Sequence, residues 1–164
     1  GELIGRSPFM MTGYYNKPGK TTESRWVDEE GNVWQRSGDM GKFDEDGFII
    51  LLDRMKDMII SGGFNVYAAD LEAVLIKHSD VHDAAVIGIP SEEWGETPLG
   101  LVVARDGAKA TPQEICDWAN QHLGKQQRLS AVEFRDSLPR STIGKLLKRE
   151  LREPYWKDRD AKVS

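Results

Sequence analysis

Residues 54–67, RMKDMIISGGFNVY, mark the point at which the pattern of the chain changes. Two short apolar runs surround the pair Gly62 and Gly63, which predicts a small hairpin whose glycines adopt positive φ. A mixture of turn and strand signals precedes this stretch, and alternating helical and strand signals follow it. We therefore divide the chain into residues 1–53 and residues 54–164.

The larger region, residues 54–164, predicts an α+β domain. Apolar residues at helical spacing begin at Leu71, a capping box at Thr111–Glu114 begins a second helix, and a basic helix lies near the C-terminus. Between them lie three predicted strands, Ala84–Ile89, Leu99–Arg105 and Val132–Phe134. The order of elements indicates three helices on a short, mostly antiparallel sheet.

The smaller region, residues 1–53, is rich in strand and turn signals and shows no convincing helix. Strand candidates flank the turn Asp28–Asn32, and another follows the turn Asp44–Gly47. A module of this size buries only a small hydrophobic core, so we expect it to pack against protein outside this chain. The start at Gly1, without Met, also suggests a fragment of a longer protein.

Composition limits the possible functions. The chain has 164 residues and a formal net charge of -5, and no run of eighteen apolar residues predicts a membrane span. No secretion signal is recognisable, so the cytoplasm is the expected location. The single cysteine, Cys116, and three histidines do not have the spacing of a metal site, so no bound metal is predicted for this chain.

Two stretches have features of nucleotide-binding motifs. Residues 13–21, GYYNKPGKT, superficially match a phosphate-binding loop, but five residues instead of four precede the Gly-Lys pair and one of them is a proline without an N–H. We interpret this stretch as a turn with a basic tip. Asp39 follows Gly38, where a carboxylate can accept two hydrogen bonds from a vicinal diol such as ribose, or simply stabilise a turn.

Residues 139–152, PRSTIGKLLKRELR, are strongly cationic in an acidic chain. A nucleic-acid-binding module would place such a tail within a wider basic face, which the acidic composition disfavours. For Lys148, Arg149 and Arg152 the pattern predicts a solvated helix face. Lys145 differs because it follows Gly144 at the end of a flexible small-residue stretch, from which its ammonium could be delivered to a neighbouring site.

The order of short motifs along the whole chain resembles the C-terminal third of the adenylate-forming (AMP-forming) acyl-CoA synthetases, or acid–CoA ligases. The motifs are Gly1–Leu3, Gly13–Tyr15, Arg36–Asp39, Asp46–Phe48, Arg54–Ile59, Ser61–Tyr67, Glu72, Pro90 with Trp94–Glu96, and Leu138–Lys145. The resemblance implies that residues 1–53 are a β-rich segment ending the large N-terminal domain. It implies that residues 54–164 are the small, mobile C-terminal domain.

In that family a carboxylic acid reacts with ATP to give an acyl-adenylate, from which the thiol of CoA displaces AMP. By resemblance, Lys145 is the catalytic lysine of the first step, because a cation stabilises negative charge gathering at the α-phosphate. Asp39 would hold the ribose hydroxyls, with Arg54 nearby on the nucleotide. ATP and its Mg would be bound mainly by the N-terminal domain, so this fragment alone is expected to be inactive.

For the second step, the resemblance implies a rotation of the small domain about a hinge at Lys56. Gly62 and Gly63 would then let the pantetheine arm of CoA pass close to the backbone, and Trp94 would stack on the CoA adenine unless it is a partly buried loop residue. The chain departs from the family pattern at Phe64 and in the stretch Lys125–Leu129, and neither departure removes a catalytic role.

Three functions therefore remain open. The favoured one is an acid–CoA ligase, with a fatty or aryl acid as the guessed substrate and the N-terminal domain of the same protein as partner. The second is an adenylating enzyme that loads the phosphopantetheine of a carrier protein. The third, of another class, is a stand-alone interaction or nucleic-acid-binding module. In the favoured function, acetylation of Lys145 would switch the enzyme off by removing its charge.

Overall fold

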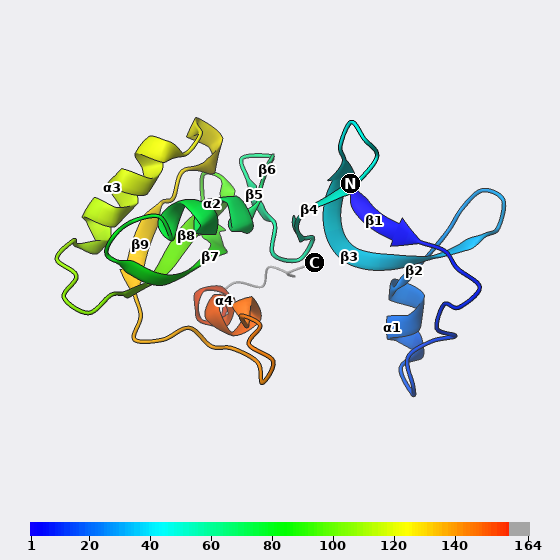
Figure 1. The fold of residues 1–164 in the computed structure, drawn as a ribbon. Helices are drawn as coiled ribbons and strands as arrows, with labels where there is room; N and C mark the ends of the chain where they lie inside the picture. Colours follow the sequence, from blue (N-terminus) through cyan, green and yellow to red (C-terminus); the bar gives the residue numbers. More distant parts are fainter. Residues whose placement is uncertain (158–164) are drawn as a thin grey trace. The chain divides into compact units, whose positions relative to one another are not determined.

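A computed structural model describes residues 1–157, which form two compact units, each with its own sheet (Figure 1). The division falls between Lys56 and Asp57. The elements of the first unit are β1 (Glu2–Gly5), α1 (Pro18–Glu23), β2 (Arg25–Val27), β3 (Val33–Phe43) and β4 (Ile49–Arg54). Strand β4 thus continues one residue past the predicted boundary after Asp53.

The first unit is built around the long strand β3, which pairs antiparallel with β1, β2 and β4. The β2–β3 turn forms where the sequence predicts it. The carboxylate of Asp28 accepts hydrogen bonds from the indole Nε1 of Trp34 at 2.8 Å and from the backbone N–H of Asn32 at 2.7 Å. These donors, led by Trp34, hold the pKa of Asp28 below its ordinary value because they stabilise its charged form.

The prediction that residues 1–53 contain no helix is wrong, because Pro18–Glu23 forms the short helix α1. A proline at the first position favours helical φ, and the hydroxyls of Thr21 and Thr22 donate to the carbonyls of Lys17 and Pro18. None of its residues is buried, so the helix leaves no apolar stripe in the sequence.

The second unit confirms the predicted α+β fold. Its elements are β5 (Ile59–Ser61), β6 (Phe64–Val66), α2 (Ala68–Leu75), β7 (Val81–Ser91), β8 (Gly95–Ala104), α3 (Pro112–His122), the 3-10 helix η1 (Lys125–Gln127), β9 (Ala131–Phe134) and α4 (Lys148–Trp156). The strand order is β6-β5-β8-β7, and all pairs are antiparallel except β8 with β9. The predicted capping box of α3 is present, with Thr111 and Glu114 as reciprocal partners.

The sheet of the second unit is buried on both faces. Ala84 and Val86 of β7 belong to the core beneath α2 and α3, whereas Ala85 and Ile87 belong to a second core beneath α4. This alternation explains why the strand is continuously apolar in sequence.

Among residues 1–157, no helix has both the length and the apolar character that a membrane span requires.

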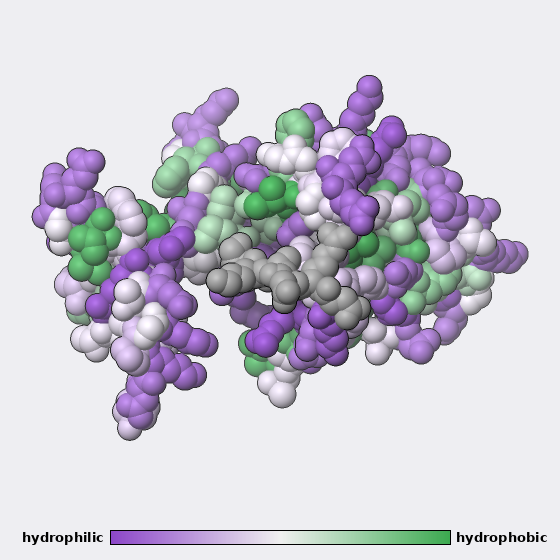
Figure 2. All heavy atoms as spheres, turned by 180° about the vertical axis from the view of Figure 1, so that it is seen from behind, coloured by the Kyte–Doolittle hydropathy of each residue, from purple (hydrophilic) through white to green (hydrophobic). Residues whose placement is uncertain are grey.

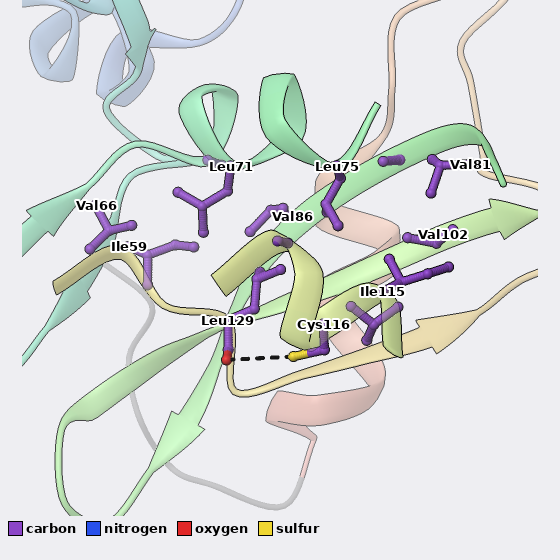
Figure 3. Close-up of a cluster of buried hydrophobic side chains, with 14 residues drawn as sticks. Ile59, Val66, Leu71, Leu75, Val81, Val86, Val102, Ile115, Cys116 and Leu129 are labelled. Carbon is purple, nitrogen blue, oxygen red and sulfur yellow. Dashed lines mark hydrogen bonds between the residues drawn. The ribbon is translucent and has the colours of Figure 1, made fainter. Parts of the chain in front are cut away.

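The first of these cores is shown in Figure 3, where Leu71 and Leu75 point from α2 toward the strands. Both leucines are fully buried, which contributes about 1.5–3 kcal/mol each. At the other side of this core, the Cys116 thiol lies 3.8 Å from the backbone oxygen of Leu129. The helices α2 and α3 are thus packed on one face of the sheet of the second unit.

Candidate functional site

Lys145 lies on a closed hairpin rather than on a flexible loop. Arg140 and Leu146 form an antiparallel bridge, Ser141 N donates to Lys145 O at 2.8 Å, and Gly144 N donates to Ser141 O at 2.8 Å. Gly144 has φ +80°, which favours glycine at this turn. Backbone hydrogen bonds thus close this stretch into a hairpin, a conformation that the sequence did not predict, while the flexibility of residues 140–143 stays a prediction.

The side chain of Lys145 is exposed, and within residues 1–157 it takes part in no ion pair. The hairpin thus presents an ammonium group to solvent from an ordered backbone. Because no carboxylate in the described part of the chain pairs with this ammonium, it is accessible to an anionic ligand.

Arg140 ties this hairpin to the sheet. Its Nη2 lies 2.7 Å from Asp83 Oδ2, at the start of β7, and its Nη1 donates to Gly144 O at 3.0 Å. One guanidinium group therefore connects the strand to the residue immediately before Lys145. Neither Arg140 nor Asp83 was predicted from sequence to be a site residue.

The predicted solvated face of α4 is wrong for two of its three cations. Lys148 Nζ lies 2.8 Å from Glu72 Oε1 with only 11% of the side chain exposed, and Arg152 lies 3.8 Å from Glu96 Oε1. Leu151 packs against the second core, so the stems of the neighbouring cations follow the helix onto the domain and meet carboxylates there.

The C-terminal turn of α4 is held by Tyr155. Its hydroxyl donates to Glu133 Oε2 at 2.7 Å and accepts from Arg135 Nη2 at 2.6 Å. Burial, reinforced by Glu133, raises the pKa of Tyr155 to about 12. The helix that follows Lys145 is thus attached to the sheet by neutral as well as charged hydrogen bonds.

Asp39 and Arg54 come together in the first unit. They are register partners on β3 and β4, and Arg54 Nε lies 3.6 Å from Asp39 Oδ1. The side chain of Arg54 is 62% exposed and that of Asp39 is 40% exposed. The pair therefore contributes little to stability and remains accessible to a ligand. The two residues predicted to contact a nucleotide therefore lie side by side on the surface of the first unit.

Gly62 and Gly63 form the two-residue turn between β5 and β6, with φ of +56° and +82°. Gly62 N donates to Trp94 O at 2.9 Å, and a Cβ at Gly62 would lie only 2.5 Å from Trp94 Cε3. The space beside Gly62 is thus occupied by the indole, whereas no atom lies within 4 Å of a Cβ built at Gly63. Trp94 itself is half exposed.

Lys56 is the last residue of the first unit and lies in the middle of a turn formed by residues 55–57. Its backbone follows Met55, whose N–H donates to Gly38 O at 2.8 Å. No strand or helix includes Lys56, so the position joins two elements without belonging to either.

Within residues 1–157, no group of three or more potential ligands could hold a metal ion.

Comparison with known proteins agrees with this arrangement. Residues 70–145 match the family model of the AMP-binding enzyme C-terminal domain. The chain is 41% identical over 157 residues to a 4-coumarate--CoA ligase-like 9 of Oryza sativa subsp. japonica, covering 96% of this chain and 28% of that protein. It is 40% identical over 164 residues to the fatty acid--[acyl-carrier-protein] ligase ScoC of Streptomyces coeruleorubidus, covering 100% of this chain and 31% of that protein.

Among solved structures, ATP-bound MatB from Rhodopseudomonas palustris matches with a TM-score of 0.81 and 35% identity. That match covers 95% of this chain and 31% of the MatB chain. The chain thus spans less than a third of the length of the relatives described here. By these similarities it belongs to the adenylate-forming ligase family, the acyl-CoA synthetases and acid–CoA ligases, and carries their C-terminal portion.

Proposed function

We propose that this chain is the C-terminal part of an ATP-dependent ligase that activates a carboxylic acid as an acyl-adenylate and transfers the acyl group to CoA. The observation that carries the proposal is the exposed side chain of Lys145 on a hydrogen-bonded hairpin, where it forms no ion pair with any residue of 1–157. The similarity to ligases across nearly the whole chain supports it. The cytoplasm remains the predicted location.

In the first step, a carboxylate oxygen attacks the α-phosphorus of ATP, and the bond to pyrophosphate breaks. Lys145 stabilises the negative charge that develops on the phosphoryl oxygens. Asp39 accepts hydrogen bonds from the ribose hydroxyls, and Arg54 supports the nucleotide from the neighbouring strand. The exposure of both side chains fits this role because each can reach a ligand without leaving a core.

In the second step, the thiol of CoA attacks the acyl carbonyl and AMP leaves. We place the hinge at Lys56, because the two units divide immediately after it. Gly63 offers an open backbone for the pantetheine arm, and half-exposed Trp94 offers a face for the CoA adenine. Gly62 serves this surface indirectly, by making room for the indole.

The surface of the first unit supports the expectation that it continues a larger N-terminal domain. Large apolar side chains are strongly exposed there, namely Phe9 at 93%, Tyr15 at 90%, Phe48 at 70%, Phe43 at 68% and Leu51 at 68%. Figure 2 shows hydrophobic residues interrupting the hydrophilic surface of the molecule. We infer that further protein covers these residues and supplies the acid pocket, the Mg site and most of the ATP site.

The carrier-protein alternative is kept because one relative, ScoC, is a fatty acid--[acyl-carrier-protein] ligase. The nucleic-acid alternative is disfavoured, because Lys148 and Arg152 are engaged in ion pairs within the unit and do not form an open basic face. Thioester formation by the full-length enzyme with free CoA, compared with a phosphopantetheinylated carrier protein, separates the first two functions. Success with the carrier alone would overturn our choice.

The Lys145→Ala variant of the full-length enzyme tests the proposal. We expect acyl-adenylate formation, measured as pyrophosphate release with a panel of fatty and aryl acids, to fall by about 100-fold or more. Thioester formation from supplied acyl-adenylate should be largely retained, because that step does not need the charge. An equal loss in both steps would contradict the role of Lys145.

A further inference from the structure

Strand β7 ends the strand order of its sheet, and side chains cover its outer edge. Asp83 Oδ1 accepts from Ala84 N at 3.0 Å, and Glu72 Oε1 accepts from Val86 N at 2.8 Å. Farther along, Gly88 O accepts from the indole of Trp156 at 3.0 Å. Backbone groups that an additional strand would pair are therefore satisfied by side chains.

The two carboxylates on this edge also hold the cations that flank Lys145 in sequence. Asp83 Oδ2 lies 2.7 Å from Arg140, which precedes the hairpin tip, and Glu72 Oε1 lies 2.8 Å from Lys148, which begins α4. Asp83 thus attaches the hairpin directly to β7. Glu72, a residue of α2 that also accepts from the backbone of β7, attaches the start of α4, which follows the hairpin.

We propose that Asp83 and Glu72 are positioning residues, which fix the location of the Lys145 ammonium through Arg140 and Lys148. This inference rests on the proposed function of Lys145. Rate depends steeply on placement, since an error of about 1 Å in a reacting group can cost about 100-fold. A hairpin whose backbone is closed but not attached would present the same charge over a wider range of positions.

The Asp83–Arg140 pair separates positioning from stability. Its side chains are 28% and 45% exposed, and a pair of this exposure contributes little to folding. Loss of the pair should therefore change the rate of adenylate formation much more than the unfolding midpoint. The Glu72–Lys148 pair is less suited to this test, because an unpaired Lys148 would remain at 11% exposure.

The experiment uses the full-length enzyme with Asp83→Asn, Arg140→Met and the double variant, each assayed for pyrophosphate release. We expect kcat to fall about tenfold in each single variant with the KM for ATP nearly unchanged, and the double variant to be no slower than either single one. Arg149→Met is the matched control, because Arg149 is an exposed cation on α4, the helix that follows the hairpin, with no ion pair in the part of the chain described, and it should keep the wild-type rate.

Hydrogen exchange of the variants provides a readout that is independent of activity. The amides of Ser141, Gly144 and Leu147 are hydrogen-bonded within the hairpin region and should exchange faster, while those of the α2 and α3 cores should not change. Faster exchange throughout the unit with a lowered unfolding midpoint would indicate a merely structural role and overturn the inference.

The remaining outcomes distinguish failure of the positioning role from failure of the proposed function. If Lys145→Ala slows adenylate formation but Asp83→Asn and Arg140→Met do not, the positioning role is wrong and the proposed function stands. If Lys145→Ala itself leaves adenylate formation at the wild-type rate, both the proposed function and this inference fail. Additive losses in the double variant would show that Asp83 and Arg140 do not act through one another, which also overturns the inference.

Discussion

Gly62 illustrates how a contact in space changes the interpretation of a single residue. The sequence suggests that both glycines of the β5–β6 turn keep a backbone open for a ligand. In the structure only Gly63 has that open space, because the indole of Trp94 packs directly on Gly62. The role of Gly62 depends on a residue from another turn, which no local pattern reveals.

This difference predicts unequal costs for two neighbouring substitutions in the 164-residue chain. Gly62→Ala should destabilise it by about 3 kcal/mol, because positive φ and a 2.5 Å approach to Trp94 Cε3 act together. Gly63→Ala, the matched control, should cost about 1 kcal/mol from backbone strain alone. Urea unfolding followed by tryptophan fluorescence measures both, and equal losses would contradict the contact.

At the scale of elements, the environment of Tyr155 in α4 predicts that the stability of the fold decreases at alkaline pH. The pKa of Tyr155 is raised to about 12 in the folded chain, so its neutral form stabilises the fold. This contribution is fully present below the unfolded pKa of about 10 and disappears as pH rises through the folded value. A phenolate absorbance titration should contain a component near the raised pKa.

The Tyr155→Phe variant is the control for this titration. It should lack the late component, and its unfolding midpoint should fall less steeply with pH than that of the wild-type chain. A late component that persists in the variant would assign the raised pKa to another group.

The elements that could be predicted from sequence are those with local signals. The capping box of α3 lies within four consecutive residues, and the turn at Asp28 satisfies its hydrogen bonds within seven residues, so both are recognisable without the fold. The ion pairs of α4 could not be predicted, because Glu72 is distant from Lys148 in sequence. Likewise α1, with no buried residue, has no apolar stripe to detect.

At the scale of the whole molecule, the division into two units sets where motion can be concentrated. Hydrogen bonding of β4 to its neighbour ends near Met55, and the second unit starts at Asp57. The proposed hinge lies in the short stretch between them, where a few backbone rotations would reorient one unit. The family could be predicted from the order of the short motifs, and the α+β fold from the order of the predicted elements, whereas no pattern in this chain predicts the acid substrate.

The hinge assignment predicts that Lys56→Pro slows the catalytic cycle of the full-length enzyme. Proline fixes φ at this position, so the rotation proposed between the two half-reactions should be hindered. Lys56→Ala, which keeps the backbone free, is the control and should retain more activity. Wild-type rates of both adenylate and thioester formation in the proline variant would exclude a hinge at Lys56.

The burial of Cys116 has a practical consequence for such measurements. Its thiol is 3% exposed, and burial raises its pKa, so the reactive thiolate is scarce at neutral pH. A cysteine introduced at Ile143, which is 76% exposed next to the hairpin tip, would therefore accept a fluorescent label almost alone. The hairpin can thus be labelled selectively for spectroscopy without first replacing Cys116.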